Sequence, residues 1–233
     1  MKWDELASLP LFIGMSHEEL EGIMTQLRID FKKYDAGKII VRRGDPCGKL
    51  IIVNSGDILC QAKADDGTYS MEETLTAPVM LQTNGIFGRF QTYTHTIKAI
   101  KPVSTLTFEK GEIQKLLASS LIFRLNLAGM LSTMLQKWEQ HLWEQQYIPQ
   151  GSTDDDKDDD KEVDALQHRI KTFLRQRCLT PAGRKTFFIK MSTLGSILGF
   201  RRQQISMALN GMQEQGLVKL SRGKITVEQM QKI

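Results

Sequence analysis

The clearest alternation of apolar and polar positions lies near the C-terminus, in residues 191–220 (MSTLGSILGFRRQQISMALNGMQEQGLVKL). Apolar residues recur there every three or four positions in two short stretches, and Gly199 separates the two. In the first stretch they are Leu194, Ile197 and Leu198, and in the second Ile205, Ala208, Leu209 and Met212. The pattern predicts two short amphipathic helices that pack on each other around a tight glycine turn.

The opposite face of the second predicted helix is polar and almost free of acidic residues. It carries Arg202, Gln203, Ser206 and Asn210, with Arg201 and Gln204 near its start. Such side chains suit base edges and phosphates, so the two helices predict a DNA-binding helix-turn-helix. Gly216 follows as the expected C-terminal glycine, and the alternating LVKL and KITV stretches around SRG predict a small hairpin, the wing.

Charge is distributed unevenly along the 233 residues. Residues 1–148 hold 16 Lys and Arg against 17 Asp and Glu, residues 149–163 hold 2 against 7, and residues 164–233 hold 13 against 3. The net charges of these segments are therefore −1, −5 and +10. A basic end that carries a helix-turn-helix is what a polyanionic partner such as double-stranded DNA requires.

Upstream of this region the pattern is that of β-structure followed by a helix. From about residue 31 to 108, short apolar runs such as KIIV and KLIIV alternate with glycines, which predicts stacked hairpins in a roll. Residues 111–146 then predict one long helix. Its apolar residues are spaced 4, 3, 4, 3, which predicts the seam of a parallel homodimer; they are Leu127, Leu131, Met134, Trp138 and His141.

These patterns predict an α+β fold with four parts. We expect a β-roll domain, of the jelly-roll kind, in residues 1–110, a dimerisation helix in 111–148, an acidic linker in 149–163 and a winged-helix DNA-binding domain in 164–233. Within the last part, residues 164–179 predict a helix. The role of the acidic linker is left open.

Composition narrows the class of protein. No apolar run approaches the ~20 residues of a membrane helix, and the first residues lack the basic start and apolar core of a signal peptide, so we expect a cytoplasmic protein. The three cysteines, Cys47, Cys60 and Cys178, are too far apart to predict a metal site or a disulfide framework. No catalytic triad, phosphate-binding glycine loop or carboxylate pair emerges, so we do not expect an enzyme.

Two stretches resemble one known family. DAGKIIVRRGDPCGKLIIVNSGDI is similar to the β-roll signature of the Crp/Fnr (catabolite activator protein and fumarate–nitrate regulator) superfamily, and TLGSILGFRRQQISMALNGMQEQGLV to its winged-helix signature. The resemblance covers nearly the whole chain, with a cyclic-nucleotide-binding-like domain at its N-terminal end. It implies a homodimeric transcription regulator that binds DNA and RNA polymerase.

The resemblance also implies roles for residues of the second helix. Arg202 stands where the family reads guanine, and Gln203 stands where many members have Glu, so that an adenine is the expected target. Ser206 completes the base-reading set, while Arg201 and Gln204 match phosphate-contacting positions. Met207 stands where some relatives have a second base-reading Arg, so one contact is expected to be missing.

The sensor region departs from the family. The cassette PVMLQTNGIFGRFQTYTHT lacks the acid that takes the ribose hydroxyl of cyclic AMP, and its one basic residue is Arg89, so cyclic AMP is not the expected ligand. The expected effector pocket consists of Thr83, Arg89, Tyr93 and Thr94. Haem remains an alternative effector, with His95, His141 or Cys47 as possible ligands, and Cys47 and Cys60 are weak candidates for a redox switch.

Two other classes of function stay open. One is a β-roll enzyme of the cupin kind, but the roll offers a single histidine, His95, where a metal site needs several. The other is a partner-binding module that keeps the helix-turn-helix only as a scaffold. Salt-dependent binding to duplex DNA separates a regulator from both.

Overall fold

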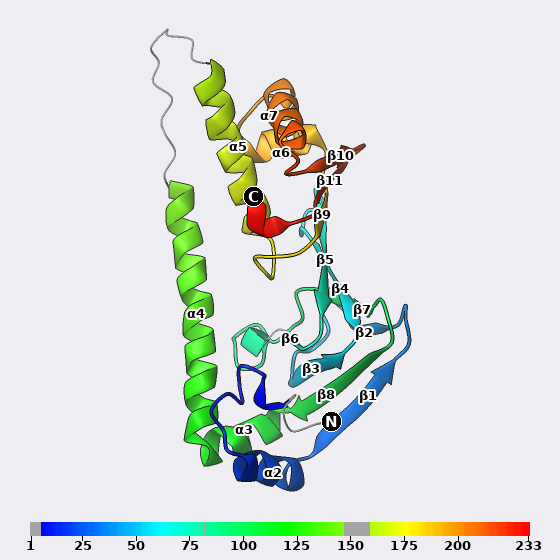
Figure 1. The fold of residues 1–233 in the computed structure, drawn as a ribbon, viewed down its shortest axis with the longest axis vertical. Coiled ribbons are helices and arrows are strands. Elements are labelled where there is room, and N and C mark those ends of the chain that lie inside the picture. Colours follow the sequence, from blue (N-terminus) through cyan, green and yellow to red (C-terminus); the bar gives the residue numbers. More distant parts are fainter. Residues whose placement is uncertain (1–5, 82, 147–158) are drawn as a thin grey trace. The chain divides into compact units, whose positions relative to one another are not determined.

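The computed structural model describes residues 6–81, 83–146 and 159–233 (Figure 1). Internal contacts divide the chain into two compact units. Unit 1 comprises Met1–Cys60 with Leu75–Glu139, and unit 2 comprises Gln61–Thr74 with Gln140–Ile233. Each unit has its own apolar core. Unit 2 therefore includes a short segment from the middle of the β-region as well as the C-terminal part of the chain.

Unit 1 is built on antiparallel strands, as the hairpin pattern predicts. One sheet has the order β1-β8-β3-β6, formed by Ile29–Tyr34, Val103–Glu109, Lys49–Ser55 and Val79–Leu81. A second run of neighbours has the order β4-β7-β2, formed by Asp57–Lys63, Thr96–Ala99 and Ile39–Val41. Alternate side chains such as Ile52, Ile58 and Ile97 are buried between the strands. The predicted β-roll is therefore confirmed.

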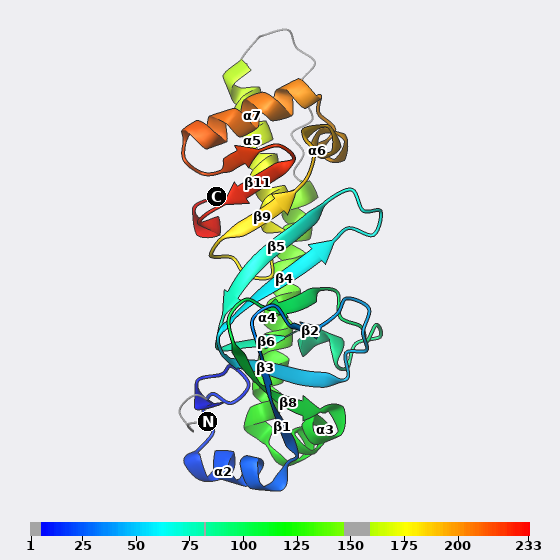
Figure 2. The same ribbon diagram turned by 90° about the vertical axis from the view of Figure 1, so that its right-hand side faces the viewer.

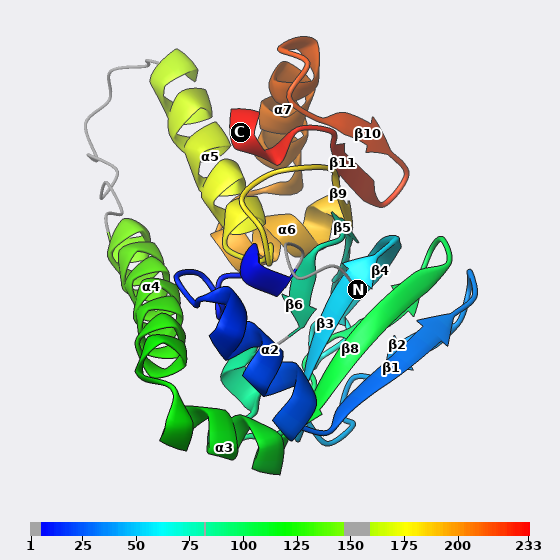
Figure 3. The same cartoon turned by 60° about the horizontal axis from the view of Figure 1, so that its bottom comes forward.

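Among the helices of unit 1, the N-terminal helix agrees with the sequence prediction, whereas the long helix after the strands does not. The helix α2 (His17–Gln26) begins with the capping box that Ser16 and Glu19 form. The expected single helix over 111–146 is wrong, because it is two helices, α3 (Lys110–Ser119) and α4 (Leu121–Gln146), bent by 115° (Figure 3). Ser120 adopts an extended conformation between them, and its Oγ accepts a hydrogen bond from the backbone N–H of Phe123 at 3.2 Å. A serine that caps the second helix stops the first.

Unit 2 holds the predicted winged helix. Its elements in the C-terminal part are α5 (Asp159–Arg175), β9 (Lys185–Phe188), α6 (Met191–Leu198), α7 (Arg202–Glu214), β10 (Lys219–Ser221), β11 (Lys224–Val227) and the 3₁₀ turn η2 (Met230–Lys232). The helix expected over 164–179 thus begins and ends earlier. The strand order is β10-β11-β9-β5, so the tip of β5 (Ser70–Thr76) completes the sheet of the wing (Figure 2).

A buried ion pair fixes the β5 tip to β9 inside unit 2. Glu73 and Lys185 are register partners on the two strands, and both side chains are 0% exposed. The carboxylate of Glu73 also accepts from the backbone N–H groups of Leu179 at 2.9 Å and Thr180 at 3.0 Å, and from the Thr180 hydroxyl. The ammonium of Lys185 also donates a hydrogen bond to the hydroxyl oxygen of Thr180, at 2.6 Å. Buried charges need such a full set of partners.

Candidate nucleic-acid interface

The corner between α6 and α7 depends on two glycines. Gly199 has φ +78°, the left-handed conformation that ends α6 as predicted. A Cβ atom on Gly195 would lie 2.5 Å from the carbonyl oxygen of Phe200, so only glycine lets the chain turn this closely. The backbone N–H of Phe200 donates to the carbonyl of Gly195 at 2.9 Å. The two helices are therefore held at a fixed angle by backbone contacts.

The apolar stripe of α7 is buried as predicted, and that of α6 is only partly so. Ile205, Ala208, Leu209 and Met212 are all 0% exposed. On α6 Leu194 is buried, but Ile197 is 42% exposed, so its placement in the core is wrong. Gly195 is buried with Leu194, and because residues two apart lie on nearly opposite sides of a helix, this buried side faces away from Ile197.

The outward face of α7 keeps the polar residues that the sequence identified. Arg201, Arg202, Gln203 and Asn210 are exposed, and Ser206 is half-buried. The carbonyl oxygen of the Gln204 side chain accepts from the backbone N–H of Arg201 at 2.9 Å, so Gln204 caps the first turn of α7. The two arginines lie where the helix dipole disfavours cations and favours bound anions. This end of α7 is therefore suited to a phosphate or another anion.

The wing carries further positive charge beside α7. The turn of the hairpin contains Arg222, which is exposed, and Gly223, which has φ +70°. Glu228 is the one acid of the hairpin, and it is shared by Arg184 and Lys219, each at 3.4 Å. Its charge is thus already balanced, and among the described residues no ion pair joins an acid to the arginines of the turn and of α7.

The residues expected to form the effector pocket differ in their burial. Thr83 and Tyr93 are buried, whereas Arg89 and Thr94 are exposed. The hydroxyl of Tyr93 is hydrogen-bonded to the Cys47 thiol, and burial raises the pKa of both groups. The guanidinium of Arg89 lies 5.9 Å from the centre of the Phe90 ring. A Cβ atom on Gly85 would lie 2.9 Å from the sulfur of Cys47, so side chains fill the interior beside the cassette.

An open groove of about 440 Å³ lies elsewhere in unit 1, along α4. None of the four expected effector residues lines it; the lining residues are Pro10, Leu125, Asn126, Gly129, Met130, Thr133 and Met134. The groove shares Met134 with the predicted dimer seam.

The residues of that seam differ in their surroundings. Leu127 is half-buried against the core of unit 1, Leu131 is 38% exposed, and Met134 is half-buried. The side chains of Trp138 and His141 lie outside the described part. Among the described side chains of α4, the most exposed leucines are Leu121, Leu125 and Leu135, at 61, 63 and 62%. An apolar surface thus follows the outer side of the helix, next to the predicted seam.

Other chemistry finds little support in the described residues. In these ranges no three His, Cys, Asp or Glu side chains gather as a metal site would require. Cys47 and Cys60 are fully buried, which does not favour a redox switch. Among the described helices none alone is long and apolar enough to span a bilayer, although α3 and the first part of α4 meet the length and composition criteria together.

Sequence reasoning missed the buried pair of Glu73 and Lys185, although a signal for it is present. Both strands alternate, so that Met71 and Glu73 on β5 point inward, as do Lys185 and Phe187 on β9. An acid and a base at inward positions of two strands predict each other as partners. This pairing would have predicted that residues 70–73 of β5 lie beside β9 in the winged-helix unit.

Comparison with known proteins identifies the fold. Residues 31–120 match the family model of the cyclic nucleotide-binding domain. The catabolite activator protein of Thermus thermophilus is 21% identical, with 94% of each chain covered and a TM-score of 0.51. The c-di-GMP responsive global regulator CLP of Xanthomonas campestris is 16% identical, with 89% of this chain and 99% of that chain covered and a TM-score of 0.46. DNR of Pseudomonas aeruginosa is 17% identical, with 96% and 92% covered and a TM-score of 0.44.

A search of curated protein sequences finds no matching relative. The family model identifies a cyclic nucleotide-binding domain, and the catabolite activator protein of Thermus thermophilus has the same fold as this chain. The N-terminal strands form a cyclic nucleotide-binding domain, and the order of roll, long helix and winged helix is that of a catabolite activator protein.

Proposed function

We propose that this chain, with its cyclic nucleotide-binding domain and its catabolite activator protein fold, is a homodimeric transcription regulator that binds specific DNA sequences. The observation that carries the proposal is the outward face of α7, which is mainly polar and basic and carries its one acid, Glu214, only at the last residue of the helix. Its apolar face is fully buried, so the helix is firmly supported while its polar face is accessible.

Each residue of that face has a proposed role. Arg202 reads guanine through two hydrogen bonds, Gln203 reads adenine, and Ser206 contacts a neighbouring base edge. Arg201 holds a phosphate at the start of α7. Gln204, whose carbonyl oxygen caps the first turn of α7, is the second phosphate contact of the proposal.

Dimerisation through α4 supplies the second recognition helix. The exposed leucines Leu121, Leu125, Leu131 and Leu135 cover the outer side of the helix, and burial against a second copy removes them from water. Of the acidic stretch 149–163, residues 149–158 lie outside the described residues, and residues 159–163 form the first part of α5. RNA polymerase is the further partner that we expect a regulator of this kind to contact.

The effector of the roll is a separate matter. The interior beside the cassette is packed by Cys47, Gly85 and Tyr93, and Arg89 is exposed, so the proposal does not depend on cyclic AMP. Haem and other small molecules remain alternatives, for which absorption spectra and native mass spectrometry of the purified protein are the direct tests.

Binding to random duplex DNA at increasing salt tests the function. A dimer with ~6–10 phosphate contacts loses about 10³–10⁵ in affinity between 50 and 200 mM salt. Selection from a random duplex pool should then return two-fold related half-sites about one helical turn apart. A module that keeps the helix-turn-helix only as a scaffold would show neither. Absence of binding at low salt would overturn the proposal.

A further inference from the structure

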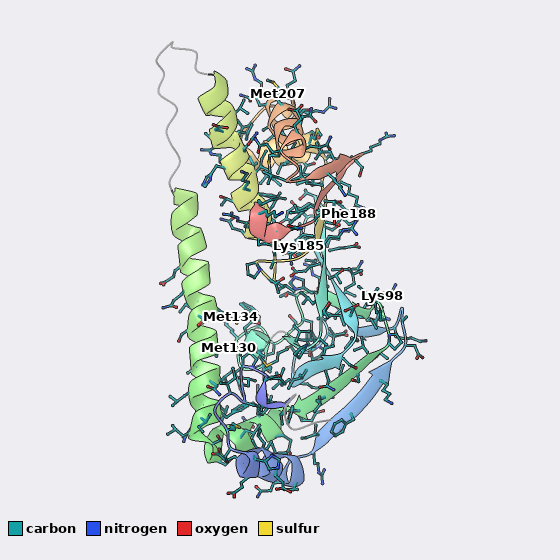
Figure 4. All side chains as sticks on the ribbon, in the orientation of Figure 1. Lys98, Met130, Met134, Lys185, Phe188 and Met207 are labelled. Atoms are coloured by element: carbon teal, nitrogen blue, oxygen red, sulfur yellow. The ribbon has the colours of Figure 1, made fainter. Side chains whose placement is uncertain are left out.

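One residue on the outward face of α7 has no polar group to offer. Met207 is 63% exposed and is the most exposed large apolar side chain among the described residues of unit 2 (Figure 4). It follows Gln203 by four positions and precedes Asn210 by three, so these side chains share one face of the helix. An apolar side chain in the middle of a polar face gains nothing from water.

The buried residues of α7 do not require a methionine there. The core stripe already consists of four fully buried side chains, of which Ala208 and Leu209 follow Met207 directly. A long flexible thioether at this position therefore serves neither the core nor the solubility of the helix. A ligand with an apolar group at that place would explain it.

We infer that Met207 determines specificity by contacting the C5-methyl group of a thymine, an inference that rests on the proposed function. Methionine has no donor and only a weak acceptor, so it cannot pair with the polar edges of the bases. The one apolar group that the four bases present in the major groove is the methyl of thymine. The chemistry of the side chain thus selects its target.

The rise of the helix gives the distance between this thymine and the guanine that Arg202 reads. Met207 lies five residues after Arg202, which is ~7.5 Å along the axis at ~1.5 Å per residue. Base pairs are ~3.4 Å apart, so the thymine lies about two base pairs from the guanine that Arg202 reads. Each half-site should therefore contain a guanine and, about two steps away on either strand, a thymine.

Replacing thymine by uracil in the selected duplex tests the contact, because uracil lacks only the methyl group. At the position assigned to Met207, the replacement should weaken binding about fourfold per half-site and about 15-fold when both half-sites change, the value of burying one methyl-sized group. Replacement at other thymines should have a smaller effect.

Variants assign the effect to the side chain. Met207→Ala removes the thioether at an exposed position where alanine favours the helix, so folding is retained. This variant should bind the thymine and uracil duplexes equally. Ile197→Ala is the matched control, since Ile197 is also an exposed apolar residue but lies on α6, and it should keep the discrimination. Met207→Gln should shift selection at the same position toward adenine.

The outcomes separate the two proposals. If no duplex is selected even by the wild-type chain, both the function and the role of Met207 are wrong. If specific duplexes are selected but Met207→Ala distinguishes thymine from uracil as the wild type does, or the assigned position shows no preference for thymine, only the role of Met207 is overturned.

Discussion

Breaking the ion pair between Glu73 and Lys185 should destabilise unit 2 strongly, and more when the acid is removed than when the base is removed. Glu73→Leu leaves the ammonium of Lys185 buried with a single remaining partner, the Thr180 hydroxyl. Lys185→Met leaves the carboxylate with three donors from Leu179 and Thr180. Breaking one partner of a buried pair costs about 3–5 kcal/mol, so we expect about 5 for Glu73→Leu and about 3 for Lys185→Met.

The double variant separates the pair from its surroundings. It removes both charges but leaves two backbone N–H groups without their acceptor, at about 1–3 kcal/mol each. Its cost should therefore lie at least ~2 kcal/mol below the sum of the two single variants. Lys219→Met is the matched control, because Lys219 makes an exposed ion pair with Glu228 that is worth less than ~1 kcal/mol.

Hydrogen exchange followed by mass spectrometry is the suitable assay, since a chain with two units need not unfold in one step. For Lys185→Met, exchange through opening of unit 2 should be about 100-fold faster, which corresponds to ~3 kcal/mol. Peptides from 61–74 should change together with those from 185–227, while peptides from β1 and β8 should not. If the 61–74 peptides kept their protection, the assignment of the β5 tip to unit 2 would be refuted.

Three further predictions concern other parts of the molecule. Gly195→Ala places a methyl group 2.5 Å from a backbone oxygen, so it should cost about 1–3 kcal/mol in thermal unfolding and weaken DNA binding. Leu125→Glu with Leu135→Glu should convert the proposed dimer into a monomer in sedimentation experiments, while Phe31→Glu, at an equally exposed residue of β1, should not. Burial raises the pKa of Cys178 to about 12, so this thiol stays protonated at pH 8 and should resist iodoacetamide until denaturant exposes it.

Local periodicity was sufficient where an element has one apolar face against one core. The stripe of α7, the capping box of α2 and the glycine ends of α6 and α7 all follow from neighbouring residues, and all are present. The break at Ser120 escaped prediction because the residues on both sides favour helix. One residue in an extended conformation, Ser120, separates the two helices. Phe123, in the first turn of the second helix, is fully buried in the core of unit 1, and this tertiary contact is not visible in the local pattern.

The effector site was beyond prediction for a different reason. Thr83, Arg89, Tyr93 and Thr94 were assigned by their position in the cassette, which says nothing about the direction of each side chain. In the structure Thr83 and Tyr93 are buried, whereas Arg89 and Thr94 are exposed. The backbone N–H of Tyr93 donates to the carbonyl of Asp45, in the loop before β3, at 2.9 Å. A pocket formed by loops requires the tertiary fold before its members can be named.

Two exposed apolar residues of the helix-turn-helix differ in whether packing explains them. Between 191 and 214 the apolar residues that remain well exposed are Ile197 and Met207. Ile197 belongs to the stripe that its spacing predicts, but α6 buries the side of Leu194 and Gly195, so Ile197 lies at the border of a packed face. Met207 belongs to no stripe and nothing in unit 2 covers it within the described residues, so its reason must lie in a partner. The uracil experiment compares these two residues directly, and a shared response would show that exposure alone, rather than position on α7, governs the contact.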